Sequence, residues 1–113
     1  MDLDFEAKFR TIIMKISKVG EEYAEAKGQS WQAQELKGSV LASIIKAQPD
    51  MPTSKAEIIA RASEEYKSYI AETASAITKE LKLKAEYEKW KASFEALRSL
   101  SSLEKSSRNL EVH

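Results

Sequence analysis

Two prolines three residues apart constrain the fold of this chain more than any other feature. Pro49 and Pro52 are the only prolines among 113 residues. Neither fits inside a helix, because proline lacks an amide N–H and its ring clashes with the preceding turn. The flanking sequence has only three glycines and is rich in Ala, Glu, Lys and Leu, a composition typical of long helices. The chain is therefore predicted to be all-α, with its main break at the proline pair.

The segment before the prolines is predicted to be helical over about residues 4–47. Its apolar residues recur at alternating steps of three and four, the spacing of a coiled-coil seam: Phe5, Phe9, Ile12, Ile16, Val19, Tyr23 and Ala26. A second apolar face, formed by Leu36, Val40, Ile44 and Ile45, is displaced from this stripe. Either Gly28 ends a first helix and Ser30 caps the next, or one long helix, straight or kinked, continues through Gly28 at a cost of about 1 kcal/mol relative to Ala. A single glycine is a weak break, which favours the long helix.

Residues 48–53 are predicted to form a loop, and a second helical region is expected over about 54–105. Ser54 and Glu57 have the spacing of a capping box, with Ser54 at the N-cap and Glu57 at N3. A further boundary at Ser63 and an uninterrupted helix are equally compatible with the sequence, so a short third helix near the loop is an alternative. The polar tail, residues 106–113, is expected to fray.

These lengths predict a single helical domain, residues 1–113, folded as an extended antiparallel helical hairpin that resembles a coiled coil. A helix of about 44 residues is ~66 Å long, whereas a compact globule of this size has a radius of gyration near ~13 Å. Apolar faces on two sides of one helix need more than one partner helix, so a homo-oligomer is expected. The residues assigned to helix packing and oligomer contacts are Phe9, Ile16, Tyr23, Val40, Ile44, Ile77, Tyr87, Trp90, Phe94 and Leu97.

The chain lacks the residues that most catalytic and metal sites need. It has no Cys and a single His, which is the last residue, so thiolate metal sites and Ser–His or Cys–His catalysis are excluded. The pairs Glu21–Glu22 and Glu64–Glu65 do not converge on one ion, because adjacent helical residues point about 100° apart. No apolar run is long enough for a signal peptide or a transmembrane helix. We therefore expect a cytoplasmic, non-enzymatic protein without a cofactor or metal.

The most distinctive segment, residues 82–100, interleaves basic residues with Tyr87, Trp90 and Phe94. The net charge of the chain is zero, but residues 79–113 carry eight Lys or Arg against six Glu. A basic track with aromatic residues on which bases stack is a pattern of single-stranded nucleic-acid binding. The candidate phosphate contacts are Lys82, Lys84, Lys89, Lys91 and Arg98. The aromatic residues also have the spacing of a buried helix stripe, and this interpretation is favoured for them.

The same segment resembles a known family. Tyr87, Trp90 and Phe94, followed by Glu95–Leu100 and a polar tail with Lys105 and Arg108, resemble small helical proteins of phage recombination modules, typified by UvsY of T-even phages. The resemblance covers about residues 30–105. It implies an oligomeric, non-enzymatic factor of the host cytoplasm that binds single-stranded DNA and helps to load a recombinase. It assigns Lys89, Lys91 and Arg98 to DNA and the aromatic residues to helix packing. Zero net charge departs from this pattern, because affinity for nucleic acid depends on phosphate neutralisation.

A second hypothesis belongs to a different class of function. The apolar stripes are also what a coiled-coil scaffold or adaptor needs when it binds only protein helices. Binding of labelled oligo-dT that weakens steeply with salt discriminates the first hypothesis from the second.

Overall fold

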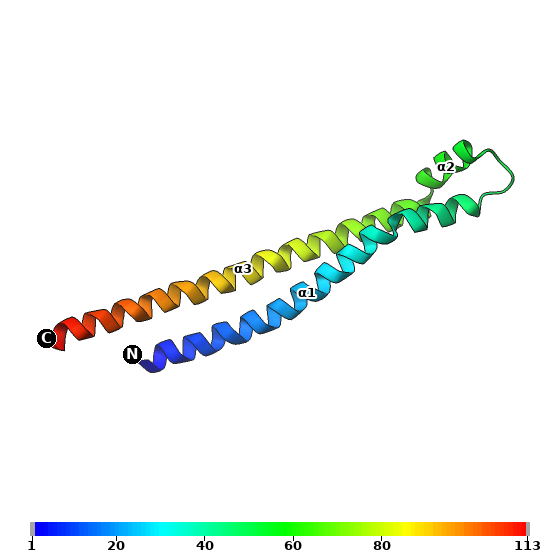
Figure 1. The fold of residues 1–113 in the computed structure, drawn as a ribbon. Coiled ribbons are helices and arrows are strands. Elements are labelled where there is room, and N and C mark those ends of the chain that lie inside the picture. Colours follow the sequence, from blue (N-terminus) through cyan, green and yellow to red (C-terminus); the bar gives the residue numbers. More distant parts are fainter. Residues whose placement is uncertain (1, 113) are drawn as a thin grey trace. The chain divides into compact units, whose positions relative to one another are not determined.

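The computed structural model describes the backbone of residues 2–112 and the side chains of residues 4–110. This part of the chain forms three α-helices (Figure 1): α1 (Asp2–Lys46), α2 (Thr53–Ala62) and α3 (Glu64–Val112). Within each of the two compact units described below, the segments of α1 and α3 run antiparallel, and the short α2 follows the proline-containing loop. The predicted all-α helical hairpin, with a short third helix near the loop, is confirmed.

Helix α1 continues through Gly28, so the structure shows the continuous helix rather than a break and a new cap. The φ angle of Gly28 is negative, as in an ordinary helix. A Cβ at this position would have no atom within 4 Å outside the helix backbone. Ser30, the alternative cap, is instead a fully buried residue in the middle of the helix.

The predicted capping box at Ser54 is wrong. Helix α2 begins one residue earlier, at Thr53, with Pro52 at the N-cap and no capping hydrogen bond from a side chain. The carbonyl oxygen of Pro52 accepts the amide hydrogens of Lys55 and Ala56, each at 3.0 Å. Glu57 does not reach back to the helix start: its carboxylate accepts two hydrogen bonds from the Arg61 guanidinium, at 3.0 and 3.1 Å.

The boundary at Ser63 is real. Ser63 has an extended conformation (φ −68°, ψ 149°) and separates α2 from α3. Its hydroxyl donates to the carbonyl of Ala60 at 2.6 Å and accepts the amide hydrogen of Tyr66 at 3.2 Å. The same side chain therefore ends one helix and caps the next, as expected of serine at an N-cap.

Helix α3 does not end near residue 105 but continues to Val112. The segment that was expected to fray is helical up to that point, and its last residue, His113, lies outside the described residues. An exposed ion pair between Arg108 and Glu104, at 2.8 Å, lies four residues apart on this last part of the helix. Pairs at this spacing stabilise helices by a few tenths of a kcal/mol, about 0.2–0.5.

The chain contains two compact units. Unit 1 consists of Met1–Ala24 and Lys82–His113, and unit 2 of Glu25–Leu81. The core of unit 2 joins all three helices through Ile44 of α1, Ala60 of α2 and Tyr66 of α3. A hydrogen bond from the Tyr69 hydroxyl to the carbonyl of Ala33, at 2.6 Å, also links α3 to α1 in this unit. Unit 1 is a pair of antiparallel helices and contains the whole basic segment.

Candidate nucleic-acid interface

All five candidate phosphate contacts lie in unit 1 on α3, and all are exposed. They are Lys82, Lys84, Lys89, Lys91 and Arg98. Arg98 forms an exposed ion pair with Glu95 at 3.2 Å. Among the described residues, none forms an ion pair with any of the four lysines. These four ammonium groups are available to an anion without the loss of an internal pair.

The five side chains form two rows rather than one cluster. Lys84, Lys91 and Arg98 follow one another at steps of seven residues, so they share one side of α3 at intervals of about 10.5 Å. Lys82 and Lys89 form the second row at the same spacing. Because Lys89 and Lys91 are two residues apart, they point about 200° from one another around the helix. The two rows therefore flank the packing face of α3 on opposite sides.

Aromatic rings fill the space between α1 and α3 in unit 1. Phe9 and Phe94 meet edge to face with their ring centroids 5.4 Å apart, and Tyr23 lies 5.9 Å from Tyr87. Gly20 of α1 lies against the Tyr87 ring, since a Cβ at this position would stand 3.1 Å from Cε1 of the tyrosine. These rings pack against one another, which leaves them unavailable as a platform for stacked bases.

Two lysines from different helices approach the Trp90 ring. The ammonium nitrogen of Lys89 lies 5.2 Å from the ring centroid and that of Lys15, from α1, lies 5.9 Å from it. On the other side of α3, the ammonium of Lys91 is 4.9 Å from the Tyr87 ring. Exposed cation–π contacts of this kind contribute about 0.5–1 kcal/mol each. They hold the lysines beside the packed rings while their charges stay at the surface.

The indole nitrogen of Trp90 is buried and finds no hydrogen-bond partner among residues 4–110. Leaving a buried donor unpaired costs about 1–3 kcal/mol. Trp90 therefore contributes apolar area and a cation–π face to unit 1 while its N–H lowers the stability of the packed pair.

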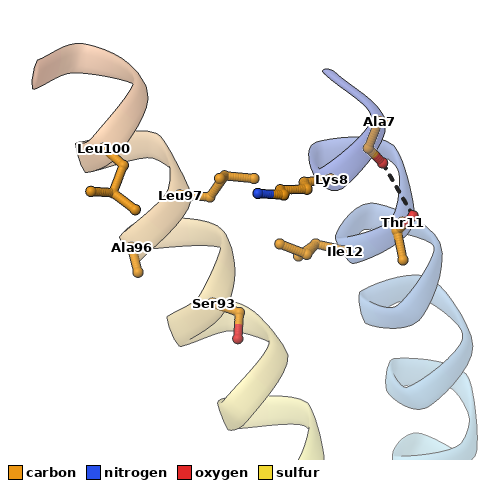
Figure 2. Close-up of a pocket in the computed structure, with 8 residues that line it drawn as sticks. All are labelled: Ala7, Lys8, Thr11, Ile12, Ser93, Ala96, Leu97 and Leu100. Atoms are coloured by element: carbon orange, nitrogen blue, oxygen red, sulfur yellow. Dashed lines mark hydrogen bonds between the residues drawn. The ribbon is translucent and has the colours of Figure 1, made fainter. Parts of the chain in front are cut away.

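A groove of about 490 Å³ lies between the N-terminal part of α1 and the C-terminal part of α3, within unit 1. Figure 2 shows the eight residues that line it: Ala7, Lys8, Thr11, Ile12, Ser93, Ala96, Leu97 and Leu100. The Lys8 side chain extends from α1 across the groove towards Leu97 (Figure 2). The Thr11 hydroxyl donates to the carbonyl of Ala7 at 3.1 Å, and the Ser93 hydroxyl donates to that of Lys89 at 3.0 Å. Both hydroxyls are thus satisfied by their own helix, and Lys8 supplies the one charged group of the groove lining.

The residues assigned to helix packing occupy different places in the two units. In unit 1, Leu97 is buried and the others are half-buried between α1 and α3: Phe9, Ile16, Tyr23, Tyr87, Trp90 and Phe94. In unit 2, Ile44 is buried in the core, Val40 packs against it and Ile77 is half-buried. The contacts described above are made within one chain.

Sequence reasoning missed Lys15, Lys8 and the groove. Lys15 belongs to the site only through the pairing of α1 with α3, which a single sequence does not reveal. The groove has a detectable signal on α3, where Ser93, Ala96, Leu100 and Leu103 follow at steps of three, four and three residues. Two of these four positions hold small residues, so the row does not stand out as a stripe of large apolar side chains.

Other kinds of site find no support in the described part of the chain. Among the described residues, no group of three or more His, Cys, Asp or Glu side chains could hold a metal ion. In the same part of the chain, no helix has a stretch sufficiently long and apolar to cross a membrane. Comparison with protein families, curated proteins and solved structures found no match to this chain.

Proposed function

We propose that this chain is a non-enzymatic, homo-oligomeric protein that binds single-stranded DNA through the two basic rows of α3. The observation that carries the proposal is that Lys82, Lys84, Lys89 and Lys91 are exposed and, within residues 4–110, form no ion pair. Lysine rows of this kind suit a regular chain of phosphates. Affinity arises when bound phosphates release their condensed counterions.

The packed aromatic rings define the kind of binding that is proposed. Tyr87 and Phe94 contact Tyr23 and Phe9 of α1, so their faces are occupied. Without stacked bases or ordered donors for base edges, the lysines read only the phosphate backbone. The proposed binding is therefore independent of base sequence and strongly dependent on salt.

Zero net charge conflicts with nucleic-acid binding by a single subunit, and the proposed oligomer removes this conflict. One subunit offers only two or three cations in each row, at intervals of about 10.5 Å. Several copies side by side multiply these rows into a longer basic track. The resemblance to phage recombination mediators adds that such a track acts in the host cytoplasm to help load a recombinase onto single-stranded DNA, without catalysis, cofactor or membrane.

A scaffold or adaptor that binds only protein helices is the second candidate function. The groove between α1 and α3 favours it, because its hydroxyls are already bonded and its lining is mostly apolar. Under this alternative, the lysines of α3 are a solvated flank of a coiled coil and have no anionic ligand.

Fluorescence anisotropy of labelled oligo-dT at 50 mM salt tests the proposal. We expect binding by the wild type, and a loss of at least tenfold in affinity when Lys84→Glu and Lys91→Glu are combined. The matched control combines Lys37→Glu and Lys55→Glu, which changes the charge equally at exposed residues of unit 2. The control should bind like the wild type.

Two results would contradict the proposal. The first is no binding of oligo-dT by the wild type at 50 mM salt, which would leave the scaffold as the better function. The second is an equal loss of affinity in the α3 variant and in the unit 2 control, which would mean that only total charge matters. Sedimentation of each variant verifies that its oligomeric state is that of the wild type.

A further inference from the structure

Unit 1 has too small a buried core for a pair of helices that stands alone. Among its described residues only Val19 and Leu97 are buried. Leucines on the flank of α3 beside the packed aromatic rings remain exposed, with 56% of Leu100 and 66% of Leu103 accessible. Two packed helices with a one-sided core are marginal in water, and small scaffolds of this kind are often completed by oligomerisation.

The accessible surface of the chain supports the same conclusion. Compact monomers expose about 6.3 M^0.73 Å², so two separate compact bodies of half this chain's mass would expose about 7,500 Å² together. The chain, of 12.7 kDa, exposes 8511 Å². The surplus of about 1,000 Å² is similar to the area of about 800 Å² that each partner buries in a standard protein interface.

The exposed leucines and the groove belong to one continuous face. On α3, Ser93, Ala96 and Leu100 line the groove, and Leu103 follows at the next step of a three–four spacing. On α1, the opposite wall is formed by Ala7, Lys8, Thr11 and Ile12, and the Lys8 and Ile12 side chains project towards α3 (Figure 2). We call this face the second seam. The first, the aromatic seam, is the face of α3 that packs against α1 through Tyr87, Trp90 and Phe94. Apart from Lys8, the lining of the second seam is apolar or carries satisfied hydroxyls, which suits apolar side chains rather than a polar small molecule. Lys8 is exposed, and a lysine can cover apolar surface with its aliphatic stem while its ammonium stays in water.

The second seam is complementary to itself. Its first half carries the small residues Ser93 and Ala96, and its second half carries Leu100 and Leu103. When two copies of α3 run antiparallel about a two-fold axis, Leu100 of one copy lies opposite Ala96 of the other, and Leu103 lies opposite Ser93. Large residues then fill the spaces above small ones on both sides of the axis, as an isologous interface requires.

We infer that a second copy of this chain occupies the groove, with its α3 antiparallel to the first and Leu100 packed over Ala96 of its partner. This inference rests on the oligomeric part of the proposed function and names the surface that forms the oligomer. The dimer leaves the row of Lys84, Lys91 and Arg98 free, because that row lies on the other flank of α3. Each dimer therefore presents two such rows that run in opposite directions. The row of Lys82 and Lys89 continues at the same seven-residue step into Ala96 and Leu103, so it lies on the side of the second seam, N-terminal to the residues that pack.

Disulfide trapping tests the inference in a chain that has no native cysteine. Ser93→Cys combined with Leu103→Cys places thiols that face each other across the proposed axis. They cannot bridge within one helix, because ten residues span about 15 Å and a disulfide needs Cα atoms within about 7 Å. We expect most of the oxidised protein to run as a covalent dimer on a non-reducing gel, without any DNA present.

Two controls make this test decisive. Glu95→Cys combined with Lys105→Cys has the same ten-residue spacing on the other flank of α3 and should remain mostly monomeric. Trapping of the two pairs to an equal extent overturns the inference. Leu100→Cys alone should also trap poorly, because antiparallel packing holds the two copies of this position apart. Efficient trapping by Leu100→Cys would indicate parallel packing and would likewise overturn the inference.

Sedimentation provides a second, independent readout. Ala96→Glu places a charge under Leu100 of the partner and should raise the dissociation constant of the dimer at least tenfold. Ala24→Glu, an exposed residue of α1 in the same unit, is the matched control and should not change it. A wild type that remains monomeric at 100 µM overturns the inference. Failure of either test leaves the oligo-dT titration to be judged separately, because that titration measures binding and not the interface.

Discussion

Glycine has different surroundings at two positions inside α1. A Cβ at Gly28 would meet no atom within 4 Å, whereas a Cβ at Gly20 would stand 3.1 Å from the Tyr87 ring. Glycine inside a helix is less stable than alanine by roughly 0.5–1 kcal/mol, because it loses more backbone entropy on folding. Close packing against Tyr87 is therefore a reason for glycine at position 20, and no comparable packing reason exists at position 28.

This difference predicts opposite outcomes for the same substitution. Gly28→Ala should raise the free energy of unfolding by roughly 0.5–1 kcal/mol. Gly20→Ala should give no gain or a loss, because the Tyr87 ring must move by a few tenths of an ångström. Urea unfolding of both variants, with Gly38→Ala as a second open position, measures the effect. Equal stabilisation at positions 20 and 28 would contradict the close packing of Tyr87.

The aromatic seam allows a second prediction at the residue scale. Phe94→Ala removes the edge-to-face contact with Phe9 and should lower the stability of unit 1 by about 2 kcal/mol, less than for a fully buried ring. Trp90→Phe should change stability by less than about 1 kcal/mol, because the lost area is offset by removal of the unpaired N–H. Thermal unfolding followed by circular dichroism compares the two. A larger loss for Trp90→Phe than for Phe94→Ala would show that the indole N–H has a partner in solution.

Apolar spacing predicted these rings as packing residues, and the structure places them between the long helices. The same spacing does not identify Lys15 as a neighbour of Trp90, because their distance depends on the register between α1 and α3. Periodicity defines the face of each helix, whereas register is determined by the contacts between the two helices. The residues that α1 contributes to the candidate site could therefore not be predicted from one sequence.

The ends of α2 show which helix boundaries can be read from a sequence. The proline pair predicted the loop to within one residue at each end, because proline fits a helix only in its first turn and disfavours the helical conformation of the residue before it. The capping box at Ser54 was wrong, since Pro52 already occupies the N-cap and its carbonyl accepts the first amides. Ser63, which has no Pro or Gly beside it, is the true cap. Capping depends on the backbone angles of a residue, and these do not follow from side-chain spacing alone.

Replacement of the two serines tests this reassignment. Ser63→Ala removes the acceptor for the Tyr66 amide and should lower the free energy of unfolding by about 1 kcal/mol. Ser54→Ala should change it by less than about 0.5 kcal/mol, because this side chain makes no capping bond. Urea denaturation of both variants measures these changes in the free energy of unfolding. A greater loss at position 54 would restore the predicted capping box.

Helix α3 carries two faces, and only one was visible as a pattern of large side chains. The aromatic seam stands out in the sequence, whereas the second seam alternates small residues with Leu100 and Leu103. A small residue is informative only when a large one faces it, and in the proposed dimer that partner belongs to another copy. The sequence thus predicted the need for further partners without identifying the surface.

At the scale of the whole molecule, the equal numbers of acids and bases conceal an uneven distribution. The charge total is 18 against 18, yet the four lysines at positions 82, 84, 89 and 91 share one segment of α3 and have no ion pairs among the described residues. Nucleic-acid affinity depends on the cations that reach phosphates rather than on the net charge of the chain. A neutral chain can therefore bind DNA when cations outnumber the acids of the same segment, as the five basic residues do the three Glu within residues 82–100.

The salt dependence of oligo-dT binding tests this central claim most directly. Five phosphate contacts per subunit predict a slope of log affinity against log salt of about −3.5, so that affinity falls about 100-fold between 50 and 200 mM salt. Loss of two contacts in the combined Lys84→Glu and Lys91→Glu variant should reduce the magnitude of the slope by about 1.4. A slope near zero, or an unchanged slope in this variant, would contradict binding through the basic rows of α3.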